Sequence, residues 1–298
     1  MPTAAVIVVP KSGIDVTQEI AGLEPVQRLV LTFQLAGIDR VVVALDSDMR
    51  EIQKFCVRLG AYFTRRAETD AQGEPGIIAA ALRYLDGKCG RAFIVSANYS
   101  LIEPETVRAL ARSDAPIVFP AYKGKRGGLV LLGSDMFGDA ALHGLNALAA
   151  SKLAAEVETA DAGITANTAA ADAIDKIAGK LALNNVLRFK IKVSLAYEKS
   201  FIGPGVVQLA HLIGETNSLT RSCDIMGMSL SRGIHIVRAL EKSLGFRVYD
   251  VSPNKSKGEG CFLTKEFSAY LGRYEAFAAE CAALTAEAFA RHFGGEAR

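Results

Sequence analysis

The hydrophobic pattern of the chain divides it into two parts that meet near residue 185. In the first part, short apolar runs rich in β-branched residues alternate with segments of helical spacing. The apolar runs cover residues 4–9, 39–45, 61–64 and 92–96. The helical segments cover residues 25–36, 52–59 and 77–85. Such alternation is typical of an open, mostly parallel sheet with helices on its faces. We therefore predict an α/β domain over residues 1–185 and a second domain over residues 186–298.

Polar segments follow three of the predicted strands, at residues 10–13, 46–48 and 97–100. Ligands of open α/β sheets bind beyond the carboxyl ends of the strands, where the strand order reverses. We expect these three segments to lie near one another and to form a ligand site.

Beyond residue 200, glycines and hydroxyl residues divide a helical pattern into short elements. A helix over residues 206–214 is followed by a second over 219–226, which ends at Gly227. Ser229 can cap a third helix that runs through Leu244. One face of this helix is apolar and is expected to point into the core: Leu230, Ile234, Val237, Leu240 and Leu244. The opposite face carries Ser231, His235, Arg238 and Lys242, with Arg232 beside them.

Two short helices, a glycine turn and a third helix with a polar face predict a helix-turn-helix. The last helix of that motif enters the major groove amino end first. Ser229, Ser231, Arg232, His235 and Arg238 are therefore predicted to contact double-stranded DNA. The alternative is an ordinary solvated helix face.

A hairpin and a long helix complete the predicted second domain. Residues 246–251 and 261–263 are expected to pair as strands, with Lys255 and Lys257 near the tip and placed to meet phosphates. Thr264 then caps an alanine-rich helix with an apolar stripe of near-heptad spacing: Phe267, Tyr270, Leu271, Tyr274, Phe277, Ala278, Cys281 and Leu284. The stripe packs either on its own domain or on a second copy of the chain. We prefer the second copy, hence a homodimer, because DNA-binding modules often dimerise.

Charge is distributed unevenly along the chain. Residues 188–298 hold 15 Lys and Arg against 11 Asp and Glu, whereas residues 1–187 hold 19 against 21. A positive excess in one module suits phosphate contact, although on charge alone an ordinary solvated face is the better interpretation.

The second domain resembles the DNA-binding domain of ModE-type molybdate-responsive regulators. The resemblance extends from about Lys190 to Phe277 and rests on residues 218–220, 226–229, 240–246 and 258–264. The wing of that family is a run of glycines around one lysine, whereas Pro253, Asn254 and Glu259 interrupt it here. The resemblance implies a winged helix-turn-helix that binds DNA.

The first domain resembles the MobA/MocA-like molybdenum-cofactor nucleotidyltransferases. The similar segments are residues 4–10, 24–28, 36–39, 93–106, 120–128 and 161–164. The resemblance implies a GT-A-like sheet and a site for Mg²⁺ with a nucleoside triphosphate, or for a molybdopterin-type ligand. Residues at such a site would be Lys11, Ser12, Gly13, Asp46, Asn98, Lys123, Lys125 and Arg126.

The residues that carry catalysis in that family are altered here. The metal-binding aspartate aligns with Asn98, and the later Asp-x-Asp-Thr signature aligns with Thr165 to Thr168, so that Asn167 replaces an aspartate. Amides and hydroxyls bring no negative charge to offset Mg²⁺. Asp46 and Asp48 are substitutes in principle, although a polar loop is the simpler interpretation. We therefore expect a degenerate, inactive enzyme.

Several function classes are excluded by composition. The five cysteines and four histidines are scattered, which predicts reduced thiols in a cytoplasmic protein and no His/Cys metal site. No apolar run approaches the ~20 residues that span a bilayer. The sequence favours a molybdenum-related, DNA-binding transcriptional regulator with a nucleotidyltransferase-like domain as sensor or interaction domain. The alternative is a molybdopterin nucleotidyltransferase with an attached DNA-binding domain.

Overall fold

A computed structural model of the chain consists of two compact units, Met1–Asn185 and Val186–Arg298. It describes residues 2–11, 19–20, 23–46, 52, 56, 59–66, 70–168, 189, 191–252 and 260–293. No helix among these residues is long and apolar enough to cross a membrane.

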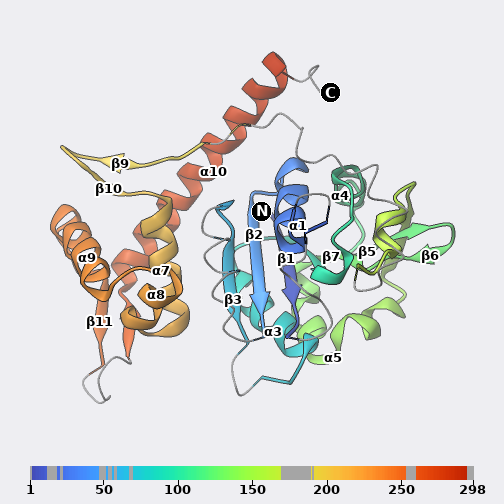
Figure 1. Cartoon of the computed structure of the whole chain (residues 1–298), viewed down its shortest axis with the longest axis horizontal. Coiled ribbons are helices and arrows are strands. Elements are labelled where there is room, and N and C mark those ends of the chain that lie inside the picture. The colour runs from blue at the N-terminus through green and yellow to red at the C-terminus, as the bar shows by residue number, and fades with distance from the viewer. Residues whose placement is uncertain are drawn as a thin grey trace. The chain divides into compact units, whose positions relative to one another are not determined.

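The first unit is built on one sheet (Figure 1). Its described strands are β1 (Thr3–Val9), β2 (Arg40–Leu45), β3 (Tyr62–Arg65), β4 (Arg91–Ser96), β5 (Ile117–Tyr122), β6 (Lys125–Arg126), β7 (Leu129–Gly133) and β8 (Ala154–Glu158). They follow the order β3-β2-β1-β4-β7-β5-β6, with β8 beside β5. Strands β1 to β4 are parallel, as are β5 and β8, whereas β7 and β6 run antiparallel to their neighbours. The predicted α/β class and mostly parallel sheet are confirmed.

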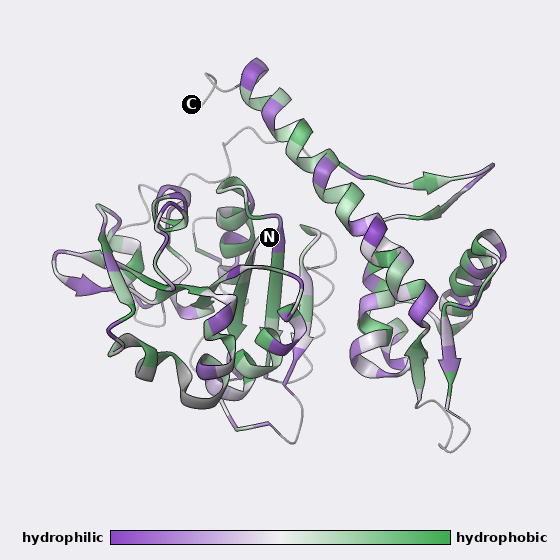
Figure 2. Ribbon diagram, turned by 180° about the vertical axis from the view of Figure 1, so that it is seen from behind, coloured by the Kyte–Doolittle hydropathy of each residue, from purple (hydrophilic) through white to green (hydrophobic). Residues whose placement is uncertain are grey.

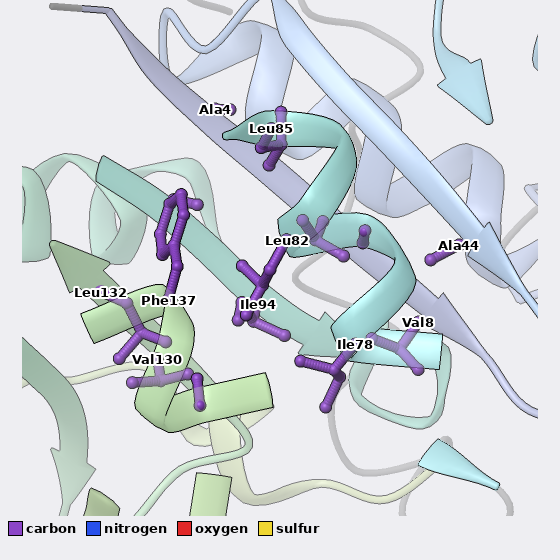
Figure 3. Close-up of a cluster of buried hydrophobic side chains, with 14 of the residues drawn as sticks. Ala4, Val8, Ala44, Ile78, Leu82, Leu85, Ile94, Val130, Leu132 and Phe137 are labelled. Carbon is purple, nitrogen blue, oxygen red and sulfur yellow. The ribbon is translucent and has the colours of Figure 1, made fainter. Parts of the chain in front are cut away.

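Alternate residues of the β-branched strands point to opposite faces of the sheet, and helices cover both faces. Helices α3 (Glu74–Leu85) and α5 (Phe137–Ala149) pack on one face, against side chains such as Val8, Ala44 and Ile94 (Figure 3). Helices α1 (Pro25–Leu35) and α4 (Pro104–Ala111) contact each other, and the ring of Phe33 on α1 lies 5.7 Å from that of Phe93 on β4. The predicted helix 52–59 lies largely outside the described residues.

The second unit is mainly helical. Its helices are α7 (Pro204–Thr216), α8 (Leu219–Ile225), α9 (Leu230–Leu244) and α10 (Lys265–Phe293). Two short hairpins accompany them, formed by β9 (Leu195–Ala196) with β10 (Ser200–Ile202) and by β11 (Tyr249–Val251) with β12 (Cys261–Leu263).

Local signals set the helix ends as predicted. The Ser229 hydroxyl accepts a hydrogen bond from the Arg232 N–H at 3.3 Å, so it caps α9, and Gly245 ends the same helix with a φ of 78°. The Thr264 hydroxyl accepts from the Phe267 N–H at 3.1 Å and begins α10. Ser218 caps α8 in the same way.

Two expectations for this unit are wrong. The strand predicted at residues 246–251 begins only at Tyr249, because the Val248 N–H bonds the Glu241 carboxylate instead of a neighbouring strand. Leu230 was expected in the core but is 40 % exposed. It occupies the first turn of α9, before the helix reaches α8 at Gly233.

The core of the second unit lies between α7, α8, α9 and the first third of α10. An ideal Cβ on Gly233 would lie 2.2 Å from the Cys223 sulfur, so α8 and α9 approach closely only because this residue has no side chain. Phe267, Leu271 and Tyr274 of α10 are buried in the same core. Farther along α10, hydrophilic and hydrophobic residues alternate (Figure 2), and Phe277 and Leu284 are exposed.

Candidate functional site

The strand register of the first unit brings three predicted segments to one edge of the sheet. Val8 pairs with Ala44 on one side and with Ser96 on the other. The residues that follow these strands therefore share the same edge, and among them are Lys11, Asp46 and Asn98. Lys11 is exposed. Ser12, Gly13 and Asp48 lie outside the described residues.

Asn98 sits in the short turn η1 (Ala97–Tyr99) directly after β4. Its backbone carbonyl accepts hydrogen bonds from the Thr168 N–H at 2.7 Å and the Thr168 hydroxyl at 2.8 Å. Its side-chain oxygen is buried and has no hydrogen-bond partner among the described residues, and the same is true of the Ser96 and Ser100 hydroxyls. Buried polar atoms without partners carry a desolvation cost. The three side-chain oxygens at this strand end could therefore form hydrogen bonds with a neutral group of a ligand.

Two glycines allow the segments around Asn98 to pack closely. The Gly128 N–H donates to the Ile164 carbonyl at 2.8 Å, and a Cβ on Gly128 would lie 2.4 Å from the Tyr99 ring. A Cβ on Gly163 would lie 1.9 Å from the Leu101 carbonyl oxygen. Close backbone approach at these two glycines fixes η1 against η3 (Ala162–Thr165).

The residues that align with the later acidic signature differ in their surroundings. The Thr165 hydroxyl bonds the Ala162 carbonyl at 3.1 Å, and Asn167 is exposed. The aspartate that is buried here is Asp161, which accepts from the Gly163 N–H, the Glu103 N–H and the Thr106 hydroxyl at 2.8–2.9 Å. Asp161 therefore ties η3 to the start of α4 and is a structural residue.

Asp46, the carboxylate best placed to replace the missing metal ligands, is already paired. The Arg66 Nε lies 2.6 Å from an Asp46 carboxylate oxygen, and the two side chains are only 18 % and 15 % exposed. Sequence reasoning missed Arg66, since the two residues lie 20 positions apart and only the parallel pairing of β2 with β3 brings them together.

The predicted cations Lys123, Lys125 and Arg126 lie at the far edge of the sheet, where β7 and β5 separate β6 from β4. Lys123 and Gly124 both adopt positive φ and form the two-residue turn between β5 and β6. The Arg126 Nε bonds Glu156 at 2.9 Å, and the guanidinium lies 4.5 Å from the centre of the Phe119 ring. Arg126 is therefore engaged within the unit, and Lys123 and Lys125 are exposed.

The described residues do not fit Mg²⁺ with a triphosphate. Magnesium prefers carboxylate oxygens, yet the strand end offers the neutral amide of Asn98 and a carboxylate, Asp46, that already neutralises an arginine. No group of three or more His, Cys, Asp or Glu that could hold a metal occurs in the described part of the chain. We derive no reaction step through a metal.

The polar face of α9 is the second candidate site. Ser229, Ser231, Arg232, His235 and Arg238 are all exposed, as predicted. None of the three basic residues forms an ion pair with a described carboxylate. Burial raises the pKa of Tyr249 on β11, and the nearby Arg238 partly opposes that rise, so helix and hairpin adjoin. Lys255 and Lys257 lie outside the described residues.

The loop end of the β11–β12 hairpin ladder is anchored to the corner between α7 and α8. The Asn217 carbonyl accepts hydrogen bonds from both the Gly260 and Cys261 N–H groups at 2.9 Å. Asn217 itself has a φ of 50° and ends α7. The hairpin is thus held at one end by this corner and at the other by Glu241 of α9.

Comparison with known proteins finds a family model that matches part of the first unit. Residues 16–162 match the family model described as "MobA-like NTP transferase domain". No curated protein sequence matches the chain.

Solved structures similar to the chain include Rv0371C from Mycobacterium tuberculosis H37Rv, determined in complex with manganese. That protein is 13 % identical, with 60 % of this chain and 100 % of that chain covered and a TM-score of 0.47. A nucleotidyl transferase from Methanothermobacter thermautotroptrophicus is 15 % identical over 59 % of this chain and 97 % of its own, with a TM-score of 0.49. CMP:2-keto-3-deoxy-manno-octonic acid synthetase complexed with CTP is 12 % identical over 62 % and 100 %, with a TM-score of 0.45.

Proposed function

We propose that this chain, whose first unit carries a MobA-like NTP transferase domain, is a DNA-binding transcriptional regulator with a molybdenum-related role. In this proposal the first unit has become a sensor or interaction domain. The observation that carries the proposal is the face of α9, which presents basic side chains to solvent with no described carboxylate to neutralise them.

The arrangement of the second unit supports a winged helix-turn-helix. The short helix α8 and the longer helix α9 meet closely at Gly233 and are joined by a turn at Gly227, which has a φ of 64°. The β11–β12 hairpin follows α9 and is anchored beside it. In motifs of this kind the second helix enters the major groove, and a hairpin wing contacts the backbone beside it.

Roles for individual residues follow from their places on α9. Ser229 and Ser231 stand at the amino end of the helix, where free N–H groups and the helix dipole favour a phosphate. Arg232, His235 and Arg238 lie along the exposed face and would reach base edges or phosphates. Lys255 and Lys257 would meet the backbone from the hairpin loop.

The test is salt-dependent binding of the full chain to a 30-base-pair duplex. Replacing Arg232 and Arg238 together by Ala should weaken binding and lower the slope of log K against log salt by roughly 1–2, because each phosphate contact releases about one counterion. Arg112→Ala, at an exposed position of the first unit, is the control for lost charge and should change little. An equal loss of DNA affinity in the Arg112→Ala control, or no DNA binding by the wild type, would refute DNA binding through α9.

In this proposal the first unit binds a ligand but does not catalyse its conversion. The buried, unpartnered oxygen atoms of Ser96, Asn98 and Ser100 favour a neutral, hydrogen-bonding group such as a nucleobase or a molybdopterin-type ring. Thermal stability of the full chain with CTP, GTP, ATP and molybdate, each with and without Mg²⁺, tests this point. We expect stabilisation by a nucleotide that does not depend on Mg²⁺.

The second candidate function is a molybdenum-cofactor nucleotidyltransferase, and the family match over residues 16–162 favours it. It requires Mg²⁺ beside Asn98 and Asp46. Stabilisation that appears only with Mg²⁺ and one nucleoside triphosphate, and that Asp46→Asn abolishes, would put this candidate first. We further propose that the regulator acts as a homodimer, as the stripe on α10 suggests.

A further inference from the structure

The β9–β10 hairpin projects from the second unit on a well-packed base. Ile202 on β10 is fully buried and pairs with Leu195 on β9. Just before β9, the Val193 carbonyl accepts a hydrogen bond from the Tyr274 hydroxyl of α10 at 2.6 Å. Because both strands are fixed to the core in this way, the hairpin is a rigid part of the unit.

The tip of this hairpin is exposed and carries an aromatic stack. Tyr197 is 75 % exposed, and its ring lies on that of Phe201, with 5.1 Å between the ring centres and 11° between the ring planes. The stack joins the two sides of the turn that contains Glu198 and Lys199, both of which are exposed. The tip therefore presents a hydroxyl and charged groups to solvent from a defined position.

The hairpin adjoins the carboxyl end of α9. Strand β10 contacts α9. Phe246, which follows the end of α9, packs edge-on against Tyr270 with 6.3 Å between the ring centres. Burial raises the pKa of Tyr270, and the nearby Tyr197 adds to that rise, so the hairpin tip lies close to the same ring. In Figures 1 and 2, α9 lies between the β9–β10 hairpin and β11. Two hairpins thus flank α9.

The segment that leads into the β9–β10 hairpin is basic. Between residues 188 and 199 the sequence holds four Lys or Arg and one acidic residue, Glu198. Lys192 and Lys199 are exposed, and neither forms an ion pair with a described carboxylate. The last turn of α9 adds Lys242, which is also exposed. Positive charge therefore continues from the exposed face of α9 to the hairpin.

We propose that the β9–β10 hairpin binds the DNA backbone on the side of α9 opposite the β11–β12 hairpin. The major groove is about 12 Å wide, and a helix that lies in it has phosphates along both walls. The β11–β12 hairpin is placed beside one wall, and the β9–β10 hairpin beside the other. Lys199 would supply a cation and Tyr197 a hydroxyl donor, which are both common partners of phosphate oxygens. This inference rests on the proposed DNA binding by α9.

The experiment measures the affinity of the full chain for a 30-base-pair duplex while the salt concentration is varied. Glu198→Lys should tighten binding roughly three- to tenfold at low salt and steepen the slope of log K against log salt by about 1, because the added cation releases one more counterion. Lys199→Glu should shift both quantities in the opposite direction. Asp114→Lys makes the same change of charge on an exposed loop of the first unit and should shift neither.

The outcomes separate this inference from the proposed function. If the wild type binds the duplex and the Arg232 and Arg238 double variant loses affinity, while Glu198→Lys and Lys199→Glu match the wild type, the hairpin does not contact DNA. If the wild type does not bind the duplex, the proposed function fails and this inference fails with it. The substituted side chains are exposed, and circular dichroism verifies that the variants fold.

A second measurement distinguishes phosphate contact from base contact. Phosphates carry no sequence information, so Lys199→Ala should weaken binding to two duplexes of unrelated sequence by the same factor. Tyr197→Phe keeps the stack on Phe201 but removes the hydroxyl, and it should weaken binding to both duplexes by a smaller common factor. Factors that differ between the two duplexes would overturn a contact confined to the backbone.

Discussion

Three arginines of the first unit and two arginines of α9 are used in opposite ways. In the first unit, Arg66, Arg83 and Arg126 each bind a carboxylate of the same unit, at Asp46, Asp70 and Glu156. In the second unit, Arg232 and Arg238 on α9 bind no described carboxylate. Charges that are neutralised internally serve the fold, whereas charges left facing solvent on a rigid helix are available to an external anion. The comparison separates the first unit, where these arginines bind carboxylates of the same unit, from α9, where the arginines are available to an external partner.

The largest effect is expected at the contact between α8 and α9. Gly233→Val should lower the free energy of unfolding of the second unit by about 3 kcal/mol or more and abolish DNA binding, because the new side chain overlaps the Cys223 sulfur. Two-stage thermal unfolding followed by circular dichroism would measure this effect while reporting the first unit separately.

A matched glycine on α10 provides the control for Gly233. Gly272 has nothing within 4 Å of an added Cβ, so Gly272→Ala should stabilise the helix by roughly 0.5–1 kcal/mol. If Gly233→Val were tolerated as well as Gly272→Ala, the close approach of α8 and α9 would not be needed for DNA binding.

The next effect concerns Asp161, the buried aspartate that joins η3 to the start of α4. Asp161→Asn should cost about 1–3 kcal/mol of stability in the first unit, because the N–H groups of Gly163 and Glu103 bond different carboxylate oxygens and an amide has only one acceptor oxygen. Chemical denaturation measures the loss. Asp114→Asn, at an exposed loop position, should be neutral. Equal stability of the two variants would mean that Asp161 does not hold η3 in place.

A variant that gains Mg²⁺ binding in the first unit would test the comparison in the opposite direction. The double variant Asn98→Asp with Arg66→Gln supplies one carboxylate and releases another, Asp46, so it should acquire Mg²⁺-dependent stabilisation of about 2–4 °C in the first unit. Asn98→Asp alone should gain less, since Arg66 still neutralises Asp46. A double variant indifferent to Mg²⁺ would show that more than these two charges was lost.

Sequence patterns predicted the elements better than the contacts between them. The β-branched runs became the parallel strands because a strand buried on both faces needs apolar residues at every position. Ser229 and Gly245 fixed the ends of α9 because capping is decided within a few residues. The Asp46–Arg66 pair could not be foreseen, since it depends on which strands become neighbours. The exposure of Leu230 depended likewise on where α8 crosses α9.

The anchoring of the hairpin's loop end at Asn217 has a consequence for local opening. The amide protons of Gly260 and Cys261 share one carbonyl acceptor at the corner between α7 and α8. In hydrogen exchange, protection follows the segment that must open to break the bond. Both amides should therefore exchange at the rate of this helical corner, more slowly than those of a two-stranded hairpin with free edges. The start of β12 would then open together with the helix pair and not with the hairpin loop.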